Sequence, residues 1–370
     1  MKATLTTLTP VHIGSGVTYN RNIDFIQSGN QIGIIDDEKI LDLIGQDNIH
    51  QWTNAIDSGG NALMQLLRQR GFKEENVADY SKRVCKLVDT DTKSQQLKEQ
   101  FRTSLKGPCI PGSSIKGALK TTIWNNLVEN KLDSISPSQL KNNFGKWNDK
   151  SIDNVLFGKD ATEKSTRFLK VGDVNFEDTE TSIYEMSVLN IRGNQWEPKD
   201  GSLLFEVIPT GSEARFEMSL NKDYLKLNHA TNKTIWDKVD TRIFEDIQRL
   251  TATVNQQTKS ILKWEYDDLK DENLNTGKKM LLIYDAVYSK IKTAKPNEMF
   301  LRIGANSGWK FTTGGWITKL GEQVSDYEIA DMRKTIQKNK VYPSNMLWPK
   351  TRKITAGGNI FGFVKVTLSD

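Results

Sequence analysis

The sequence predicts an α+β protein in which strands and helices are mixed without a regular strand–helix alternation. Alternating hydrophobic residues predict a strand near each end of the chain, over Lys2–Thr7 and Gly362–Leu368. The second half begins mainly helical, with one long helix or two over Lys233–Leu269 and another over Lys278–Lys292. Four more strand-like runs occupy the middle, at Arg167–Val174, Ser182–Asn190, Leu203–Ile208 and Glu213–Leu220.

The N-terminal third is expected to start as β structure and then to become helical. Ile23–Gln27 and Gln31–Ile35 pair as a hairpin, because the Ser-Gly-Asn between them favours a tight turn. Apolar residues then recur at helical spacing within Asp36–Lys106, as in Val77–Leu87. Short helices are expected within Ser138–Leu156.

The C-terminal part combines short strands with glycine-rich segments. Met299–Ile303 resembles a strand, and Gly308–Trp316 is rich in aromatic residues and glycine. Ser325–Asn339 is predicted to be a helix with an acidic first half and a basic second half, the order that the helix dipole favours. The final strand, Gly362–Leu368, is expected to dock the C-terminus into a sheet.

The chain has 370 residues, enough for two or three packed units. We expect a first region of residues 1–220 and a helical region of residues 221–370 whose last strands pack back on the first. No apolar run approaches the roughly 20 residues that span a bilayer, and the N-terminal segment lacks the apolar stretch of a signal peptide. Two cysteines are too few for a disulfide framework or a cysteine-built zinc site, so we expect a cytoplasmic protein.

The positive charge is concentrated in two windows that contain no acidic residue. The formal net charge is +5, of which Phe101–Val128 contributes +4 and Met332–Ser369 contributes +8, leaving −7 for the rest. Such segregation indicates a polyanionic partner, although a solvated basic helix face can produce the same count.

The segment Ile-Pro-Gly-Ser-Ser-Ile-Lys-Gly opens a helix that is expected to continue to about Asn130. Pro111, Gly112, Ser113 and Ser114 stand where free backbone N–H groups and the helix dipole favour a phosphate, and Lys116 adds a positive charge. The segment lacks the Gly-Lys-Ser/Thr of a nucleotide-binding Walker loop. An ordinary capped helix is the alternative interpretation.

The first strand is followed by Thr-Pro-Val-His-Ile-Gly-Ser-Gly at residues 9–16. Gly14, Ser15 and Gly16 predict a tight loop that a ligand can approach closely. His12 is a candidate for ligand contact, although a lone histidine is more often structural. The histidines are scattered, so neither a zinc site nor another metal site is predicted, and no cofactor is expected.

Basic, aromatic and glycine residues are mixed again near the C-terminus. Lys350, Arg352 and Lys353 precede the glycines of a basic loop, and Trp309 and Lys310 follow a glycine in a similar mixture. Cations contact phosphates and aromatic rings stack on bases, so these residues are candidates for single-stranded RNA binding. Burial of the tryptophan in a core is the alternative.

Together these motifs resemble the RAMP-superfamily proteins of type III-A CRISPR-Cas systems. The resemblance includes Leu156-Phe-Gly before Arg167-Phe-Leu-Lys-Val-Gly-Asp-Val, besides the two glycine motifs and the C-terminal basic loop. The opening motif and the length are most similar to the fifth Csm subunits. The motifs cover both ends and the middle of the chain.

The resemblance implies a ferredoxin-like (RNA-recognition-motif) core with large helical insertions and a mainly helical second half. It also implies a non-catalytic subunit of the Csm interference complex that holds the 3′ region of the guide RNA and supports its maturation. The implied partners are guide RNA, other Csm subunits, especially the repeated backbone subunit, and host nucleases that trim the guide. By motif, the residues that would face the RNA are His12, Gly14, Ser113, Ser114, Lys116 and Lys353. We add Arg167 from the middle motif.

One departure argues against catalysis. The related backbone subunits cut RNA with an aspartate in the loop after their first strand, but Thr9–Asn22 contains no acidic residue. Asp24 follows inside an apparent strand, where a structural role is expected, so no catalytic residue is assigned. Two alternatives remain open: an endoribonuclease in which His12 and a lysine act as an acid–base pair, and a protein-bridging subunit without RNA contact.

Overall fold

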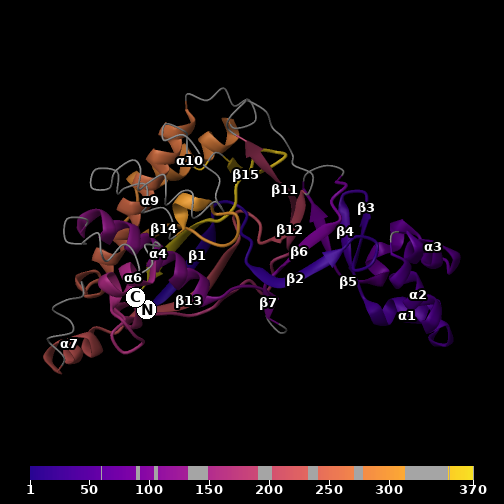
Figure 1. Ribbon diagram of the computed structural model, residues 1–370, viewed down its shortest axis with the longest axis horizontal. Helices are drawn as coiled ribbons and strands as arrows, with labels where there is room; N and C mark the ends of the chain where they lie inside the picture. The colour runs from indigo at the N-terminus through magenta and orange to yellow at the C-terminus, as the bar shows by residue number, and fades with distance from the viewer. Residues whose placement is uncertain are drawn as a thin grey trace, which may run out of the picture.

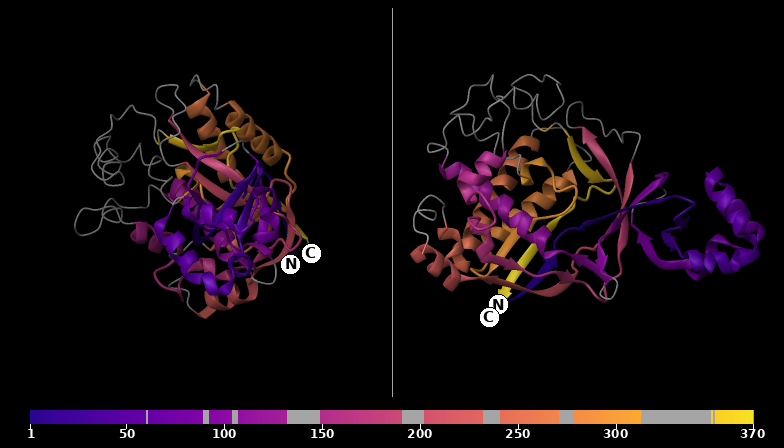
Figure 2. Two further views of the ribbon diagram at one scale, coloured as in Figure 1. Left: turned by 90° about the vertical axis from the view of Figure 1, so that its right-hand side faces the viewer. Right: turned by 60° about the horizontal axis from the view of Figure 1, so that its bottom comes forward.

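The computed structural model describes residues 1–59, 61–88, 92–103, 107–131, 149–190, 202–231, 241–270, 278–312, 349 and 351–369. The protein has a large lobe that carries both chain termini and an arm that ends in three helices (Figure 1). The right-hand view in Figure 2 shows the same separation of lobe and arm. No helix within the described ranges is long and apolar enough to cross a bilayer.

A five-stranded sheet forms the centre of the lobe, and all its neighbouring strands are antiparallel. Its order is β14 (Glu298–Arg302), β16 (Phe363–Ser369), β1 (Lys2–Thr7), β13 (Glu213–Leu220) and β9 (Leu169–Val171). The first and last strands of the chain therefore pair directly, from Lys2 opposite Ser369 to Thr7 opposite Val364.

The helices α4 (Gly112–Lys131) and α9 (Ile247–Leu269) complete a ferredoxin-like unit with this sheet. In chain order the unit runs β1, α4, β9, β13, α9, β16, and its strands lie in the order β16-β1-β13-β9. That is the split strand–helix–strand arrangement of the ferredoxin-like fold, with β14 added at the edge beside β16. The predicted α+β class and ferredoxin-like core are confirmed.

Alternation along β1 explains why the sheet buries one face. Ala3, Leu5 and Thr7 are buried, and the residues between them are more accessible. Leu119 of α4 and Val254 of α9 are buried in the same core cluster as Ala3 and Leu5. Each such aliphatic side chain contributes about 1.5–3 kcal/mol on burial. Figure 1 shows α4 and α9 gathered around this sheet.

A second sheet of eight strands connects the lobe to the arm. Its order is β2 (Gly14–Asn20), β6 (Gln96–Gln100), β12 (Leu203–Val207), β11 (Ser182–Asn190), β5 (Ser81–Leu87), β4 (Gln31–Ile35) and β3 (Phe25–Ser28), with β15 (Thr351–Thr355) paired to β11. The helices of the arm, α1 (Asp37–Ile44), α2 (Ile49–Ser58) and α3 (Ala62–Gln69), share a hydrophobic cluster with residues of β3 and β4.

The remaining elements are short strands and surface helices. A three-stranded sheet consists of β10 (Val174–Asn175), β8 (Gly107–Ile110) and β7 (Arg102–Thr103). Within the described ranges, the other α-helices are α6 (Asp149–Phe157), α7 (Lys222–Thr231) and α10 (Lys278–Lys292), and α10 packs on α9. The 3₁₀ turns are η1 (Gln46–Asn48), η2 (Glu74–Tyr80), η4 (Ser165–Phe168), η5 (Arg242–Phe244) and η6 (Trp309–Phe311).

Several predicted elements occur where the pattern placed them, including β1, the hairpin of β3 and β4, α4, β11, β13 and α10. The helical prediction for Asp36–Lys106 is wrong beyond Tyr80, since β5, β6 and β7 follow. In β5, Ser81, Cys85 and Leu87 are buried by pairing with β4 and β11, so long-range strand pairing overrides the local helical spacing.

The C-terminal basic segment also differs from its prediction. Thr351–Thr355 is the strand β15 rather than a loop, because it pairs with the outer part of β11. Most of Ser138–Leu156 and all of Ser325–Asn339 lie outside the described residues. The division at residue 220 stays a prediction, and strands from both sides of it share the five-stranded sheet.

Candidate nucleic-acid interface

The buried side chain of Gln100 joins the two glycine motifs. Its Oε1 accepts a hydrogen bond from the Ile13 N–H at 2.9 Å, and its Nε2 donates to the Cys109 carbonyl at 3.0 Å. Ile13 belongs to the segment after β1, and Cys109 lies in β8, directly before α4. The amide therefore fixes the two motifs, far apart in sequence, next to each other.

The glycines at 304 and 362 bring the C-terminal segments to the same place. The Ala305 N–H donates to the His12 carbonyl at 2.9 Å, and the Gly362 N–H donates to the Pro10 carbonyl at 2.9 Å. A Cβ on Gly304 would lie 2.3 Å from the His12 carbonyl oxygen, so only glycine permits this approach. Residues 9–13 are thus tied to the segment before α4, the segment after β14 and the segment before β16.

His12 lies inside this junction and is only 2% exposed. Its Nδ1 is 2.6 Å from the Glu206 carbonyl oxygen, and its ring packs edge-on against Phe205 at 5.0 Å between centroids. Burial lowers the pKa of His12 below its ordinary value. We therefore assign His12 a structural role and omit it from the candidate interface.

The segment Gly14–Gly16 is part of strand β2 rather than a free loop, with an irregular register between Gly14 and Thr18 opposite β6. Gly14 and Gly16 are exposed. The Ser15 hydroxyl donates to Glu99 Oε2 at 2.8 Å. A Cβ on Gly16 would meet no atom within 4 Å, so the strand edge offers open backbone there. This edge can be approached closely by a ligand.

At the start of α4, Gly112 allows close packing between backbones. A Cβ there would lie 2.2 Å from the Val171 carbonyl oxygen. The Gly112 N–H donates to the Asp173 carboxylate at 2.7 Å, so an acidic side chain already interacts with the positive end of the helix. A phosphate at that point would be repelled. The buried Gly112 is therefore structural, and the adjoining Pro111 is partly buried.

The side of α4 beyond its first residue remains accessible. Ser113 is exposed, Ser114 and Lys116 are half-buried, and Lys116 forms no ion pair with any residue that the structure describes. Partial burial lowers the pKa of Lys116, because desolvation disfavours its ammonium group. One turn further on, Lys120 is paired with Asp153 at 2.5 Å. Lys116 is thus the cation at the start of α4 that is accessible to a phosphate.

Lys310 and Arg352, which the sequence analysis named as candidates for RNA binding, are buried in an internal charge cluster. Lys310 is 1% exposed and Arg352 is 6% exposed. Glu265 accepts from Arg352 Nε at 2.8 Å and lies 3.5 Å from Lys310 Nζ, and Asp268 also pairs with Lys310. Because these cations are neutralised inside the lobe, we omit them from the surface that contacts the internal phosphates of an RNA strand.

The other candidate residues have mixed surroundings. Arg167 donates to the Thr162 carbonyl and lies over the Tyr224 ring, which gives it an intramolecular role. Trp309 is half-buried against the main core. Lys353 is exposed on β15, next to the buried Arg352, and Lys350 lies outside the described residues.

A second buried charge cluster was not anticipated from the sequence. Glu206 is fully buried in β12 and binds Arg83 Nη2 at 2.9 Å, Arg102 Nη1 at 3.1 Å and the Thr181 hydroxyl at 2.7 Å. A single acid inside the apolar run Leu-Leu-Phe-Glu-Val-Ile was its only signal, and Gln100 had none. The cluster joins β12 to β5 and β7.

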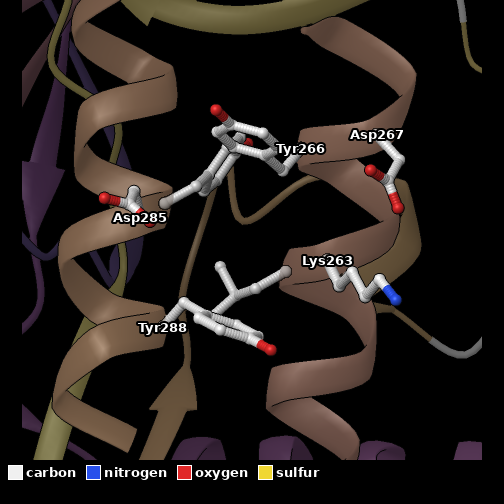
Figure 3. A pocket seen from close by; sticks show the side chains of 7 residues that line it. Lys263, Tyr266, Asp267, Asp285 and Tyr288 are labelled. Carbon is white, nitrogen blue, oxygen red and sulfur yellow. The ribbon is translucent and has the colours of Figure 1, made fainter. Parts of the chain in front are cut away.

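A groove between α9 and α10 is a poor site for RNA. It has a volume of about 280 Å³ and is lined by tyrosines together with Lys263, Asp267 and Asp285. Figure 3 shows these side chains projecting from the two helices. One cation against two carboxylates makes the lining net negative, which disfavours phosphate. Within the described ranges, no cluster of three or more histidines, cysteines or carboxylates could hold a metal ion.

The residues 4–311 match the sequence model of the RAMP superfamily. The chain therefore belongs to the RAMP superfamily. Its fold is similar to that of a chain in the cryo-EM structure of a Csm–crRNA–target RNA ternary complex in a type III-A CRISPR-Cas system, with 20% identity, a TM-score of 0.73, and coverage of 99% of this chain and 100% of that chain.

The crystal structure of Csm5 from T. onnurineus is also similar, with 17% identity and a TM-score of 0.66. That comparison covers 99% of this chain and 100% of the Csm5 chain. No curated protein matches the sequence significantly. At these identities the two structures establish the shared fold, along the whole length of the chain.

Proposed function

We propose that this chain is a non-catalytic, RNA-binding subunit of a type III-A Csm interference complex. In this proposal it holds the 3′ region of the guide RNA, supports guide maturation and contacts other Csm subunits in the cytoplasm. The partners are guide RNA, the repeated backbone subunit and host nucleases that trim the guide. Membership of the RAMP superfamily and the full-length fold similarity to Csm chains support this assignment.

The observation that carries the proposal is the convergence of the glycine motifs around residues 9–13. Gln100 ties the segment after β1 to the start of α4, and Ala305 and Gly362 tie it to the C-terminal segments. Near these ties, the accessible groups are the backbone of Gly14 and Gly16 and the side chains of Ser113, Ser114 and Lys116. We add the exposed side chain of Lys353 on β15. Hydroxyls, backbone N–H groups and lysines are the usual partners of RNA phosphates.

The same region offers little to a nuclease. His12 is buried and hydrogen-bonded to a backbone carbonyl, so it is not available as an acid–base group beside Lys116. The nearest carboxylate after the loop, Asp24, accepts hydrogen bonds from Asn20 in a tight turn at 2.7 Å and 3.2 Å. These contacts favour the binding function over the endoribonuclease alternative.

Affinity purification of the tagged full chain from cells with a CRISPR array tests the proposal. We expect guide RNA whose 3′ region is protected from added ribonuclease, together with other Csm subunits. Recovery of Csm subunits after ribonuclease treatment, with no protected RNA and no RNA binding by the purified chain, would favour the protein-bridging alternative. Salt dependence separates the two further, because phosphate contacts weaken steeply with salt.

A further inference from the structure

A cationic pocket lies beside the internal charge cluster of Glu265, Lys310 and Arg352. Its volume is about 240 Å³, and its lining includes Tyr284, Arg302, Asn306 and Arg352. The walls come from α9, α10, the segment after β14, and β15, so four parts of the chain that are distant in sequence build it. This pocket shares Tyr284 with the net-negative groove between α9 and α10 that Figure 3 shows, but its other lining residues are different.

Arg302 is an unusual buried cation. It is 7% exposed and has no ion-pair partner among the described residues. Its Nε donates to the Phe361 carbonyl at 2.9 Å, while Nη1 and Nη2 have only long contacts of 3.4 Å, to Tyr284 and Asn306. Its guanidinium also lies over the Phe311 and Phe363 rings at 5.0 Å and 4.9 Å. A buried cation without a carboxylate is costly unless an anion joins it.

Two further donors in the pocket walls have no hydrogen-bond partner in the described structure. One is Nη2 of Arg352, which lies 3.9 Å from a carboxylate oxygen of Asp268, beyond hydrogen-bond distance. The other is Nδ2 of Asn306. Buried donors without a partner cost about 1–3 kcal/mol each, so the presence of two in the lining of one pocket indicates a bound acceptor.

The backbone at Asn306 is also held in an uncommon conformation. Its φ is +64°, in the left-handed region, between Gly304 at +79° and Gly308 at +84°. Asn22, at +62°, is the other non-glycine residue with positive φ among those described, and its side chain donates to Asn61 at 3.0 Å. Asn22 therefore has a local structural partner, whereas the Asn306 amide projects from a left-handed turn without one.

The charges of the lining select the ligand. Arg302, Arg352 and Lys353 supply three positive charges and Glu265 one negative charge, so the lining carries a net charge of +2. A phosphate monoester carries about −1.5 to −2 at pH 7, which balances this charge better than a phosphodiester or a carboxylate. The volume of about 240 Å³ accommodates a phosphate and part of the attached sugar better than a complete dinucleotide.

We propose that the pocket bounded by Arg302, Asn306, Arg352 and Lys353 binds the phosphate monoester group of a nucleotide. The ligand is either a free nucleoside monophosphate or the phosphorylated end of an RNA strand, since both present the same dianion. The inference does not depend on where the interior of a guide RNA binds, because internal phosphodiesters are monoanions. In this pocket, Nδ2 of Asn306 donates a hydrogen bond to the phosphate.

Calorimetric titration of the full chain with adenosine 5′-monophosphate and with adenosine tests the proposal. We expect the monophosphate to bind at least about tenfold more tightly, as a charge-assisted hydrogen bond to the phosphate predicts. Asn306→Gly removes the amide and suits the positive φ, so it should lower monophosphate affinity about tenfold without unfolding the chain. Asn22→Gly, the matched change, should leave the affinity unaltered.

Short RNAs with a terminal phosphate or a terminal hydroxyl distinguish the two sources. If the phosphorylated RNA binds more tightly than adenosine 5′-monophosphate, the ligand is a strand end. If the two bind with equal affinity, the pocket is a nucleotide site. Both outcomes support the proposed pocket. Absence of any phosphate preference, or equal losses in Asn306→Gly and Asn22→Gly, would refute it. Retained binding of hydroxyl-ended RNA in that case would leave the proposed RNA-binding function standing.

Discussion

Arg352 donates from Nε to Glu265 at 2.8 Å, and both side chains are buried, while the next residue along β15, Lys353, is exposed. Adjacent basic residues of one strand therefore face opposite environments, as the two-residue period of a strand requires. The basic C-terminal segment contains a structural cation beside a surface cation. A double substitution of the pair would confuse the two roles.

Arg352→Ala should lower the free energy of unfolding by about 3–5 kcal/mol, because it leaves the Glu265 carboxylate buried with a weaker partner. Lys353→Ala should change stability by less than about 0.5 kcal/mol and weaken RNA binding. Urea denaturation measures the stability of both variants, and titration with RNA measures their affinity. Loss of RNA affinity in Arg352→Ala with unchanged stability would mean that Arg352 contacts RNA directly.

Stability should fall in acid through Glu265. Burial alone would raise the pKa of Glu265, but Arg352 and Lys310 hold it below its ordinary value in the folded protein. The resulting stabilisation is therefore present above the unfolded-state pKa and is lost as the pH falls through the lower folded-state pKa. Urea unfolding between about pH 3 and pH 7 should show a shallower acid loss in Glu265→Gln. The exposed Glu217→Gln is the control, and identical profiles for Glu265→Gln and the unaltered chain would contradict the assignment.

Two glycines of α4 should respond to alanine in opposite directions. Gly112→Ala places a Cβ against the Val171 carbonyl oxygen, at 2.2 Å, and should destabilise the protein by about 1–3 kcal/mol. Gly117 has no atom within 4 Å of a Cβ, so Gly117→Ala should stabilise the helix by about 0.5–1 kcal/mol. The melting temperatures of both variants test this prediction. Equal shifts of the melting temperature in the two variants would mean that Gly112 is not a packing residue.

RNA binding should weaken steeply with salt, with log K against log salt sloping by about −3 to −4 if four to six phosphates are contacted. Lys116→Ala should reduce the magnitude of this slope by about 0.7, since one phosphate contact is lost. Lys120→Ala removes a charge from the same helix that is already paired with Asp153, so the slope should stay constant. A slope near zero for the unaltered chain would remove the polyanion interpretation altogether.

The purified chain should not cleave RNA, with or without magnesium. Cleavage needs a placed base, an activated nucleophile or a metal ion, and His12 is buried against Phe205 with its Nδ1 at the Glu206 carbonyl. Incubation with a labelled guide precursor measures this. Cutting that survives purification and disappears in His12→Gln would establish an enzyme instead of a binding subunit.

Local patterns were sufficient for much of the fold. Alternation predicted β1 and β13, and the prolines, serines and apolar spacing after Ile110 predicted α4. The motifs also predicted the superfamily and its ferredoxin-like core, since glycine loops and helix starts are short-range features. The strand β5 within Val77–Leu87 was not predictable from the spacing of its apolar residues. Its pairing partners, β4 and β11, lie far away along the chain.

The sequence by itself determined which segments matter: the glycines after β1, the start of α4 and the basic C-terminus. Only the tertiary structure decided which side chains in them are accessible. Arg352 and Lys353 are neighbours in sequence, yet one neutralises Glu265 inside the lobe and the other meets solvent. Residue type fixes the charge of a side chain, but its burial depends on distant elements packing around it. For that reason His12 resembled a ligand contact in the sequence and is enclosed by Phe205 and Ala305 in the fold.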